Sequence, residues 1–390
     1  MGIAMKEIYF DNSATTRICE EALEEYIRVS REVYGNPSSR HRLGFLAEQA
    51  LNRARADILA SLGAREGRVL FTSGGTEGNN LAISGRAHAK ARFRGGRIIT
   101  TMGEHSSVSE TLNALSAEGF DIVRIPTAGG VFDMRALADA LNARTLLVSV
   151  MAVNNETGAL YPLKQIADAV HRTAPEALFH VDATQSYMKV PFTPKGIGAD
   201  LITLSSHKIE GPKGVGALWV ADGVIKQRGL SPLLIGGGQE GGLRSGTENV
   251  PGACAFGVAA RTYFAAFRER HEALSSLRAY LIEALGALGE SVTLNIPPVS
   301  APHILSVTVH GMKSETVLND LSDKGIYVSS GSACSSHDAA LSSALLAFGK
   351  TEDEADSTIR VSLSYRNTRE EADAFVAALG ETVRTRAKKH

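Results

Sequence analysis

A lysine that follows an apolar strand is the first candidate for chemistry. Lys208 closes residues 205–208 (SSHK), just before the turn 211–214 (GPKG). A free lysine has a pKa of about 10.4 and is a poor nucleophile at neutral pH, but desolvation and neighbouring cations lower that pKa and allow the amine to form a Schiff base. Most lysines are solvated loop charges, so this segment needs support from the rest of the chain.

An aspartate at the end of another apolar strand is the second candidate. Asp182 follows residues 178–181 (LFHV), where a buried carboxylate is costly without a cationic partner. Its ordinary role would be a helix N-cap, which is the favoured interpretation from the residue alone. The alternative partner is the protonated ring nitrogen of pyridoxal phosphate, which an aspartate in such a position usually tunes.

Two junctions between a strand and a helix add an anion site and a histidine. Residues 74–76 (GGT) lie between an expected strand and a helix, so free backbone N–H groups and the Thr76 hydroxyl would face an anion. The segment matches neither the Walker loop nor G-x-G-x-x-G, which disfavours a nucleotide. His105 lies at a similar junction, where a capping or core role and a functional role are equally expected.

The three cysteines differ in their surroundings. Cys334 stands in residues 329–336, which otherwise hold five serines, one glycine and one alanine and contain no large side chain. Such a loop can be exposed and mobile, which suits a thiol that carries a group between two sites. Cys254 and Cys19 suit the commoner case of a buried, inert thiol.

The segments that must position these residues alternate between strand and helix. Strands separated by helices indicate βαβ units, and therefore an α/β fold with a mostly parallel sheet covered by helices and with chemistry at the strand ends. The pattern predicts strands at 68–73, 97–102, 121–126, 145–153, 178–183, 200–205 and 216–220, and helices at 76–93, 104–118, 133–141 and after Pro162.

After the glycine-rich passage 236–246 the pattern changes to a smaller α+β unit. A long helix is expected from Pro251 to about Leu285. We predict a large domain over residues 15–260 and a small domain over 1–14 and 261–390 that carries Cys334. The further elements expected there are strands at 304–309, 326–329 and 358–364, a helix at 314–324 and a C-terminal helix from Arg369.

The composition excludes several classes of protein. The chain has 390 residues, of which 44% are hydrophobic and 21% charged, as in soluble globular enzymes, and it is too long for one domain of about 150 residues. A net charge of −1 gives no bulk attraction to nucleic acid or an anionic membrane, and no apolar run reaches the roughly 18 residues of a membrane span. Three cysteines without a C-x-x-C pair predict neither disulfides nor a metal site, and a cytoplasmic location is expected.

Together these segments resemble the cysteine desulfurases of the NifS/IscS type, class V members of the fold-type I pyridoxal phosphate enzymes. Nine stretches follow the family's order across almost the whole chain, and the series is far more specific than any one of them. They are FDNSATT (10–16), YGNPSS (34–39), FTSGGTEGNN (71–80), EHSSV (104–108), NNETG (154–158), FHVDATQ (179–185), SSHKIEGPKGVGALWV (205–220), RSGTENVPG (244–252) and SSGSACSS (329–336).

The resemblance implies a role for each candidate. Lys208 would hold pyridoxal 5'-phosphate covalently and move the Cα proton of the substrate, Asp182 would pair with the pyridine nitrogen, and His105 would stack on the ring. Cys334 would take the sulfur of L-cysteine as a persulfide and leave L-alanine. Gln185 would reach the ring hydroxyl, and the phosphate would be held by Gly75, Thr76, Ser205 and His207. Thr247 would reach the phosphate of a neighbouring subunit. Asn155 and Arg366 would bind the substrate carboxylate, and Asn155 is also expected at the cofactor.

The same resemblance implies partners and leaves other functions open. The active unit would be a homodimer that passes sulfur to an acceptor or an iron–sulfur scaffold protein. One alternative is a selenocysteine lyase, and another is a class V lyase or aminotransferase in which Cys334 is incidental. A non-catalytic sulfur-relay or scaffold component is the third, but the presence of Lys208, Asp182, His105 and Cys334 together argues against it.

The chain departs from the family pattern close to these residues. Gly75 and Gly78 replace the usual Ala and Ser of the phosphate-side segment. Tyr365 replaces the usual Gly before Arg366, and a ring at this position could narrow the substrate pocket.

Overall fold

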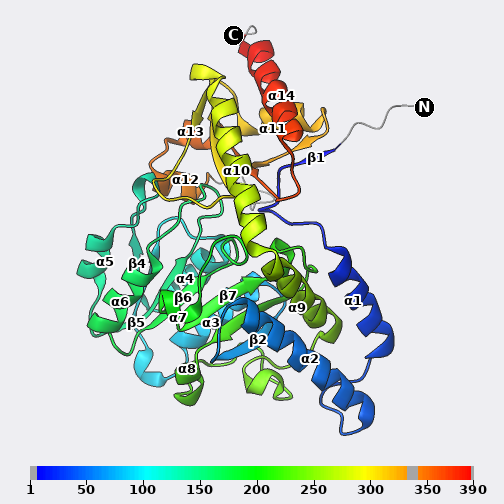
Figure 1. Ribbon diagram of the computed structural model, residues 1–390. Helices are drawn as coiled ribbons and strands as arrows, with labels where there is room; N and C mark the ends of the chain where they lie inside the picture. The colour runs from blue at the N-terminus through cyan, green and yellow to red at the C-terminus, as the bar shows by residue number, and fades with distance from the viewer. Residues whose placement is uncertain (1–6, 332–340, 388–390) are drawn as a thin grey trace.

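The computed structural model describes residues 7–331 and 341–387 of the chain. They form a larger unit around a seven-stranded sheet and a smaller unit around a four-stranded sheet, stacked one on the other (Figure 1). The long helix α10 (Phe267–Gly286) rises from the larger unit into the smaller one. The first strand, β1, and the last helix, α14, both lie in the smaller unit.

The sheet of the larger unit has the strand order β2-β8-β7-β6-β5-β3-β4. Strand β8 runs against its two neighbours and the other six strands share one direction, so the sheet is mostly parallel, as the sequence pattern predicts. The strands are β2 (Arg68–Thr72), β3 (Arg97–Thr101), β4 (Asp121–Ile125), β5 (Thr145–Met151), β6 (Leu178–Asp182), β7 (Leu201–Ser205) and β8 (Gly216–Val220).

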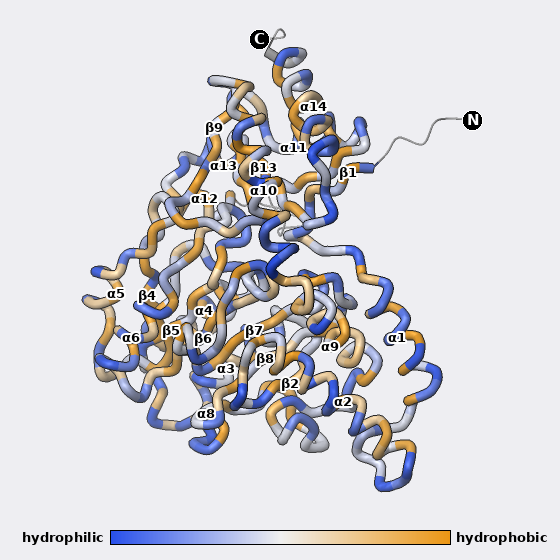
Figure 2. The backbone as a smooth tube through the Cα atoms, viewed as in Figure 1, coloured by the Kyte–Doolittle hydropathy of each residue, from blue (hydrophilic) through white to orange (hydrophobic). Residues whose placement is uncertain are grey.

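Helices cover both faces of this sheet, because successive residues of a strand point to opposite sides. Leu70, Ile98, Leu147 and Leu201 pack with α3 and α4, whereas their sequence neighbours pack with α2, α6 and α9 on the other face. Figure 2 shows the hydrophobic colour along the strands and more hydrophilic colour on the outer turns. The helices are α1 (Glu20–Glu32), α2 (Arg42–Ser61), α3 (Gly75–Ala87), α4 (Ser106–Ala117), α5 (Met134–Ala140), α6 (Leu163–Thr173), α7 (Pro194–Ile197), α8 (Asp222–Lys226) and α9 (Val250–Ala265).

The smaller unit has its own core, in which Leu281 of α10, Val307 and Phe375 are fully buried. Its sheet has the order β12-β13-β10-β9, and β1 pairs in parallel with β11 beside it. The elements are β1 (Ile8–Tyr9), β9 (Val292–Leu294), β10 (Ile304–Val309), α11 (Ser314–Ser322), β11 (Ile326–Tyr327), β12 (Ser329–Ser330), α12 (Ser343–Phe348), α13 (Glu352–Asp356), β13 (Thr358–Ser362) and α14 (Arg369–Ala387).

The N-terminal segment, residues 8–19, connects the two units. In the smaller unit the backbone N–H of Ser13 donates to the Ser362 hydroxyl over 2.8 Å. Further along, the N–H of Thr16 donates to the carbonyl oxygen of His207 over 2.9 Å. This segment therefore lies between the smaller unit and the loop that carries Lys208.

The structure differs from the expected elements in several places, of which three bear on the architecture. The helix expected from Pro251 to about Leu285 is interrupted at Ala266, whose φ of −112° and ψ of 20° are not helical. The break falls where the packing partner changes, because α9 packs on the larger core and α10 on the smaller one. The strand expected at 326–329 is two short strands in different sheets, and helices α1 and α2 were not predicted.

Candidate active site

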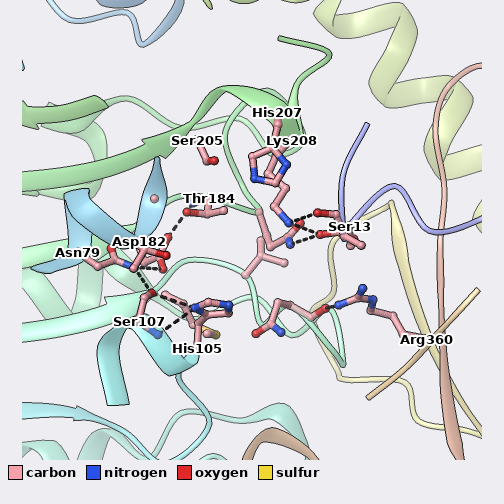
Figure 3. Close-up of a pocket in the computed structure, with 17 residues that line it drawn as sticks. Ser13, Asn79, His105, Ser107, Asp182, Thr184, Ser205, His207, Lys208 and Arg360 are labelled. Atoms are coloured by element: carbon pink, nitrogen blue, oxygen red, sulfur yellow. Dashed lines mark hydrogen bonds between the residues drawn. The ribbon is translucent and has the colours of Figure 1, made fainter. Parts of the chain in front are cut away.

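A cavity of about 370 Å³ lies at the carboxyl ends of β2, β3, β5, β6 and β7. Parallel strands bring these ends to one edge, where the chain turns into loops and helices and ligands usually bind. The volume is typical of a small-molecule site. The cavity is lined by Ser13, Ala14, Gly75, Thr76, Asn79, His105, Ser107, Met151, Val153, Asn155, Asp182, Thr184, Gln185, Ser205, His207, Lys208 and Arg360 (Figure 3).

The amine of Lys208 lies in the wall of this cavity. Figure 3 shows it pointing at the N-terminal segment, where Nζ donates to the carbonyl oxygen of Ser13 and, over 2.7 Å, to that of Ala14. Lys208 itself ends the short 3-10 turn Ser206–Lys208 that follows β7. The turn and the two carbonyl groups together fix the amine at the cavity.

Asp182 ends β6 and is only 5% exposed. Its carboxylate accepts a hydrogen bond from Asn79 Nδ2 over 2.7 Å and another from the backbone N–H of Thr184 over 2.9 Å. Residues 184–189 form turns rather than a helix, so the N-cap interpretation is wrong. Because both donors are uncharged, the negative charge of Asp182 is available to a cationic group in the cavity.

His105 is the N-cap of α4 and lines the cavity as well. Its Nδ1 accepts a hydrogen bond from the backbone N–H of Ser107 over 3.1 Å, which fixes the ring. The Ser107 hydroxyl lies 2.9 Å from the same nitrogen and accepts from Asn79 over 2.8 Å. Asn79 thus connects the imidazole of His105 with the carboxylate of Asp182.

Gly75, Thr76, Ser205 and His207 lie together at the strand ends that an anion would face. Gly75 opens the 13-residue helix α3, and a Cβ atom at this position would lie 2.9 Å from Thr184 Oγ1, so the backbone itself forms the wall. Burial, followed by the charges of Lys208 and Lys213, lowers the pKa of His207 to about 4. At neutral pH His207 is therefore an uncharged hydrogen-bonding group.

Arg360 reaches the cavity from β13 in the smaller unit, across from Lys208 (Figure 3). Its guanidinium donates to the carbonyl oxygen of Asn155 over 3.1 Å and pairs with the Asp11 carboxylate over 3.1 Å, and its side chain is only 6% exposed. Its Nε is buried without a hydrogen-bond partner among the described residues. An arginine inside a buried strand is costly, and this was the signal by which the sequence could have identified it.

Two residues expected at the site, Arg366 and Thr247, do not line this cavity. Arg366 lies outside it and makes two hydrogen bonds to the Glu210 carboxylate, of 3.0 and 3.1 Å, so its expected position at the substrate carboxylate is wrong. The expected narrowing by Tyr365 is also wrong, because its hydroxyl donates to Glu210 over 2.9 Å outside the cavity. Thr247 is exposed and lies elsewhere on the larger unit, and Cys334 lies outside the described residues.

The other side chains that sequence reasoning missed lie inside stretches it had already selected. Ser13, Asn79 and Thr184 all line the cavity and belong to the segments 10–16, 71–80 and 179–185. The signal was therefore present, but nothing in the sequence says which residues of a stretch point inward.

Two carboxylic acids lie close to the residues of the cavity wall, Glu104 fully buried and Glu156 partly buried. Glu104 accepts hydrogen bonds from the Thr101 hydroxyl over 2.7 Å and from the backbone N–H of Met151 over 3.1 Å, which ties the end of β3 to the end of β5. Burial raises the pKa of Glu104 to about 8. Glu156 accepts from the Ser342 hydroxyl, and burial raises the pKa of its carboxyl to about 7.

Unpaired atoms in the cavity wall test whether a cofactor fits. Ser13 Oγ, Asn155 Oδ1 and Thr184 Oγ1 are buried and have no hydrogen-bond partner within residues 7–331 and 341–387. Buried polar atoms are nearly always paired, so these three atoms indicate a polar ligand. With the carboxylate of Asp182 for a ring nitrogen and the amine of Lys208 for an aldehyde, they fit pyridoxal phosphate.

The fold and this constellation define a fold-type I enzyme of the pyridoxal phosphate class. The family description Aminotransferase class-V matches residues 8–375, and the chain belongs to this family. Its members depend on pyridoxal phosphate. In the described part of the chain no helix is long and apolar enough to cross a bilayer, and no cluster of three acidic, His or Cys side chains could hold a metal.

Relatives of known type cover almost the whole chain. The NifS/IcsS protein homolog of Lactobacillus delbrueckii subsp. bulgaricus is 41% identical over 382 residues, 96% of either chain. The cysteine desulfurase IscS of Methanosarcina thermophila is 38% identical and covers 97% of this chain and 92% of its own. A solved NifS-like protein matches with a TM-score of 0.89 at 37% identity, over 97% of this chain and 100% of its own. These matches confirm the resemblance and the fold class.

Proposed function

We propose that the protein is a pyridoxal phosphate-dependent cysteine desulfurase that converts L-cysteine to L-alanine and keeps the sulfur as a persulfide on Cys334. The observation that carries this function is the cavity that both Lys208 and Asp182 line. Relatives named cysteine desulfurase at 37–38% identity support the substrate, as does a solved structure entitled "SspA in complex with cysteine", whose chain is 32% identical.

Different residues of the cavity would bind different parts of the cofactor. Asp182 and Gln185 would hold the ring of the cofactor, His105 would cover its face, and Lys208 would hold it covalently. Gly75, Thr76, Ser205 and His207 would hold its phosphate. The bound cofactor supplies an electron sink that weakens the bonds at the substrate's Cα. The amine of Lys208 then accepts the Cα proton and returns a proton to the product.

Arg360 takes the place that Arg366 was expected to have. A guanidinium can bind a carboxylate through two parallel N–H groups. Arg360 is a buried arginine that lines the cavity, and its Nε has no hydrogen-bond partner among the described residues. Asn155 lies beside it, because its carbonyl oxygen accepts from Arg360. We assign the carboxylate of L-cysteine to this pair.

The sulfur transfer needs a second thiolate. The thiolate of Cys334 would attack the substrate's sulfur, so that a new S–S bond forms and the Cβ–S bond breaks. The electron pair of the broken bond stays on Cβ, which is protonated to the methyl group of alanine. The serine-rich sequence around Cys334 supports this role, since it contains no large side chain to bury the thiol.

A homodimer is the proposed active unit. Large apolar side chains are exposed on the larger unit, with Tyr34 at 70%, Phe45 at 55% and Ile235 at 88% exposure. Contiguous patches of exposed apolar side chains are typical of protein–protein contacts, and we propose that these residues belong to such a patch in the dimer interface. Ile235 and Thr247 flank the glycine-rich passage 236–246, which suits the proposed reach of Thr247 to the phosphate of the neighbouring subunit.

The proposed acceptor is a sulfur-carrying or iron–sulfur scaffold protein in the cytoplasm. The name IscS of several relatives supports the proposed kind of acceptor. Cys19 and Cys254 are free and buried, which supports a reducing compartment.

Two variants test this function. Lys208→Ala should lose the visible absorption that borohydride reduction also removes, and alanine formation should stop. Cys334→Ala should still change the cofactor spectrum with L-cysteine but release almost no sulfide in the presence of a thiol. A wild-type protein that cannot be loaded with pyridoxal phosphate would contradict the proposal. Faster alanine formation from selenocysteine than from cysteine would favour a selenocysteine lyase.

A further inference from the structure

A cluster of charged and aromatic side chains lies between the two units, outside the cavity. At its centre is the carboxylate of Glu210, which is 7% exposed. Arg366 donates to it through Nε over 3.0 Å and through Nη2 over 3.1 Å, and the Tyr365 hydroxyl donates over 2.9 Å. We call these three residues the Glu210 clamp. It joins the loop after β7 to the segment after β13.

One end of the clamp is the loop that carries Lys208, two residues before Glu210. The backbone of Glu210 is fixed on both sides by the N-terminal segment, because its N–H donates to Thr16 Oγ1 over 2.8 Å and its carbonyl oxygen accepts from the N–H of Cys19 over 2.9 Å. Its φ of +64° lies in the left-handed region, which costs a residue with a side chain about 1 kcal/mol or more. A non-glycine residue at such a position indicates that the carboxylate compensates for the strain.

The other end of the clamp continues the strand that carries Arg360. Strand β13 ends at Ser362, and Tyr365 and Arg366 follow on the next turn. The clamp therefore connects the two sides of the cavity, the amine of Lys208 on one unit and the guanidinium of Arg360 on the other.

Further cations and rings surround the clamp from every side. The ring of Tyr365 packs edge-on against Tyr263 of α9 at 5.7 Å, and the guanidinium of Arg270 of α10 lies 4.2 Å from the Tyr365 ring centre. Lys189 donates to the Tyr263 hydroxyl over 2.8 Å, and burial lowers the pKa of this lysine to about 8. The Glu210 carboxylate is thus the negative centre of a positively charged seam.

We propose that Glu210 is a positioning residue, which Arg366 and Tyr365 hold by its carboxylate so that the Lys208 amine keeps its place relative to Arg360. The proposal rests on the roles given to Lys208 and Arg360 above. The clamp touches neither cofactor nor substrate, so it acts through the Lys208 loop.

Two variants break the clamp in different ways. Arg366→Met removes the guanidinium, whose side chain is 61% exposed, without opening a core. Glu210→Gly removes the carboxylate and at the same time relieves the left-handed backbone. The matched control is Arg261→Met, because Arg261 is 56% exposed and pairs over 2.6 Å with the Asp57 carboxylate far from the cavity.

Three readouts separate positioning from simple stabilisation. In the loaded enzyme, both clamp variants should lower kcat for L-cysteine about 10- to 100-fold, since misplacement by about an ångström has effects of this size. They should also shift the pH midpoint of the visible lysine–cofactor band, which a distant loss of stability does not move. In the cofactor-free protein, hydrogen exchange should become faster in residues 205–215. Arg261→Met should leave all three readouts unchanged.

Retention of the wild-type kcat and band midpoint in both folded clamp variants would overturn the proposal. If either variant fails to fold, Tyr365→Phe decides, because it removes one hydrogen bond and no charge. The Tyr365→Phe protein should show the same band shift at smaller size, and an unchanged midpoint would reject the clamp. A wild-type protein that takes up no pyridoxal phosphate would instead reject the proposed function, so the two failures are distinguishable.

Discussion

Two arginines near the end of β13, Arg360 and Arg366, differ in whether they can bind a carboxylate in the cavity. Arg360 is buried beside the cavity and pairs with Asp11, whereas Arg366 is mostly exposed and pairs with Glu210. Arg360 stands in the apolar stretch 358–363 and Arg366 in the polar turn that follows it, and the fold shows that Arg360 lines the cavity. Arg360 is the group that can present a planar fork to a carboxylate inside the cavity.

Replacing Arg360 should therefore weaken substrate binding selectively. Arg360→Met is expected to raise KM for L-cysteine with a smaller effect on kcat, and to lower kcat/KM about 10- to 100-fold, because a hydrogen bond to a charged group is worth about 1.5–3 kcal/mol. Steady-state alanine formation measures both constants. Binding of cysteamine, which has no carboxylate, should not change in the variant. A KM that rises in Arg366→Met but not in Arg360→Met would restore Arg366 as the carboxylate ligand.

Glu104 should make the stability of the protein depend on pH. Its pKa rises from 4.5 to about 8 on folding, so between these values the folded chain holds a proton that the unfolded chain has lost. The contribution of Glu104 to the free energy of unfolding is therefore fully present below pH 4.5. It is lost as the pH rises from 4.5 to about 8, at up to about 1.4 kcal/mol per pH unit. Glu104→Gln keeps the hydrogen bonds and has no proton to lose.

The melting temperature of Glu104→Gln should therefore exceed that of the wild type increasingly from about pH 5 to about pH 8. A series of thermal melts of both cofactor-free proteins measures the difference. Glu110→Gln, an exposed residue of α4, is the control and should follow the wild type at every pH. Parallel curves for Glu104→Gln and the wild type would mean that Glu104 is ionised in the fold.

At the scale of elements, helix α3 owes its position to two glycines. Gly75 lets the backbone form the cavity wall, and Gly78 faces β7, where a Cβ atom would lie 2.8 Å from Thr203 Cγ2. The helix can therefore lie close enough to the sheet for its first turn to reach the cavity. The sequence marks both positions as departures from the family pattern, and the structure gives the spatial reason at Gly78.

This contact predicts that the effect of Gly78→Ala on stability changes sign when Thr203 is replaced by serine. Gly78→Ala should lower the melting temperature, because overpacking costs about 1–3 kcal/mol. Thr203→Ser removes the Cγ2 atom and keeps the hydroxyl that lies 2.9 Å from His180 Nε2. In that background Gly78→Ala should stabilise the protein, since alanine favours a helix by about 1 kcal/mol over glycine. Additive effects of the two changes would show that the contact is not strained.

Local signals explain which parts of the site could be predicted from the sequence. Lys208 and Asp182 follow apolar strands directly, so neighbouring residues alone place them at one sheet edge. The pairing of Arg366 with Glu210 joins residues that are 156 positions apart, and no local pattern reports it. The break at Ala266 is missed for the same reason, since both helices are apolar on one side and only their packing partners differ.

At the scale of the whole molecule, the mostly parallel sheet and the smaller α+β unit were predicted from the alternation of strands and helices. The domain boundary near residue 260 stays a prediction, which the helix break at Ala266 supports. The proposed homodimer would depend on surface residues whose partners are in another chain, and for these residues a single sequence gives only the resemblance.

The exposed apolar residues of the larger unit predict which substitution would disrupt the proposed dimer. Ile235→Asp should give a monomer by analytical ultracentrifugation, because a carboxylate cannot be buried unpaired in an interface. If Thr247 reaches the neighbouring phosphate, the monomer should also bind pyridoxal phosphate more weakly. Val299→Asp, at an equally apolar position of 62% exposure on the other unit, is the control and should remain a dimer. A dimeric Ile235→Asp protein would place the interface elsewhere.

The pairing of β1 with β11 also constrains the order of events during synthesis. Ile8 leaves the ribosome long before its partner Ile326, because most of the described chain lies between them. At about 5–20 residues per second, the N-terminal strand waits for tens of seconds. The seven-stranded sheet is complete once β8 has emerged, long before β13. A nascent chain can therefore already contain Lys208 and Asp182, which would bind pyridoxal phosphate, while it still lacks Arg360, which would bind the substrate carboxylate.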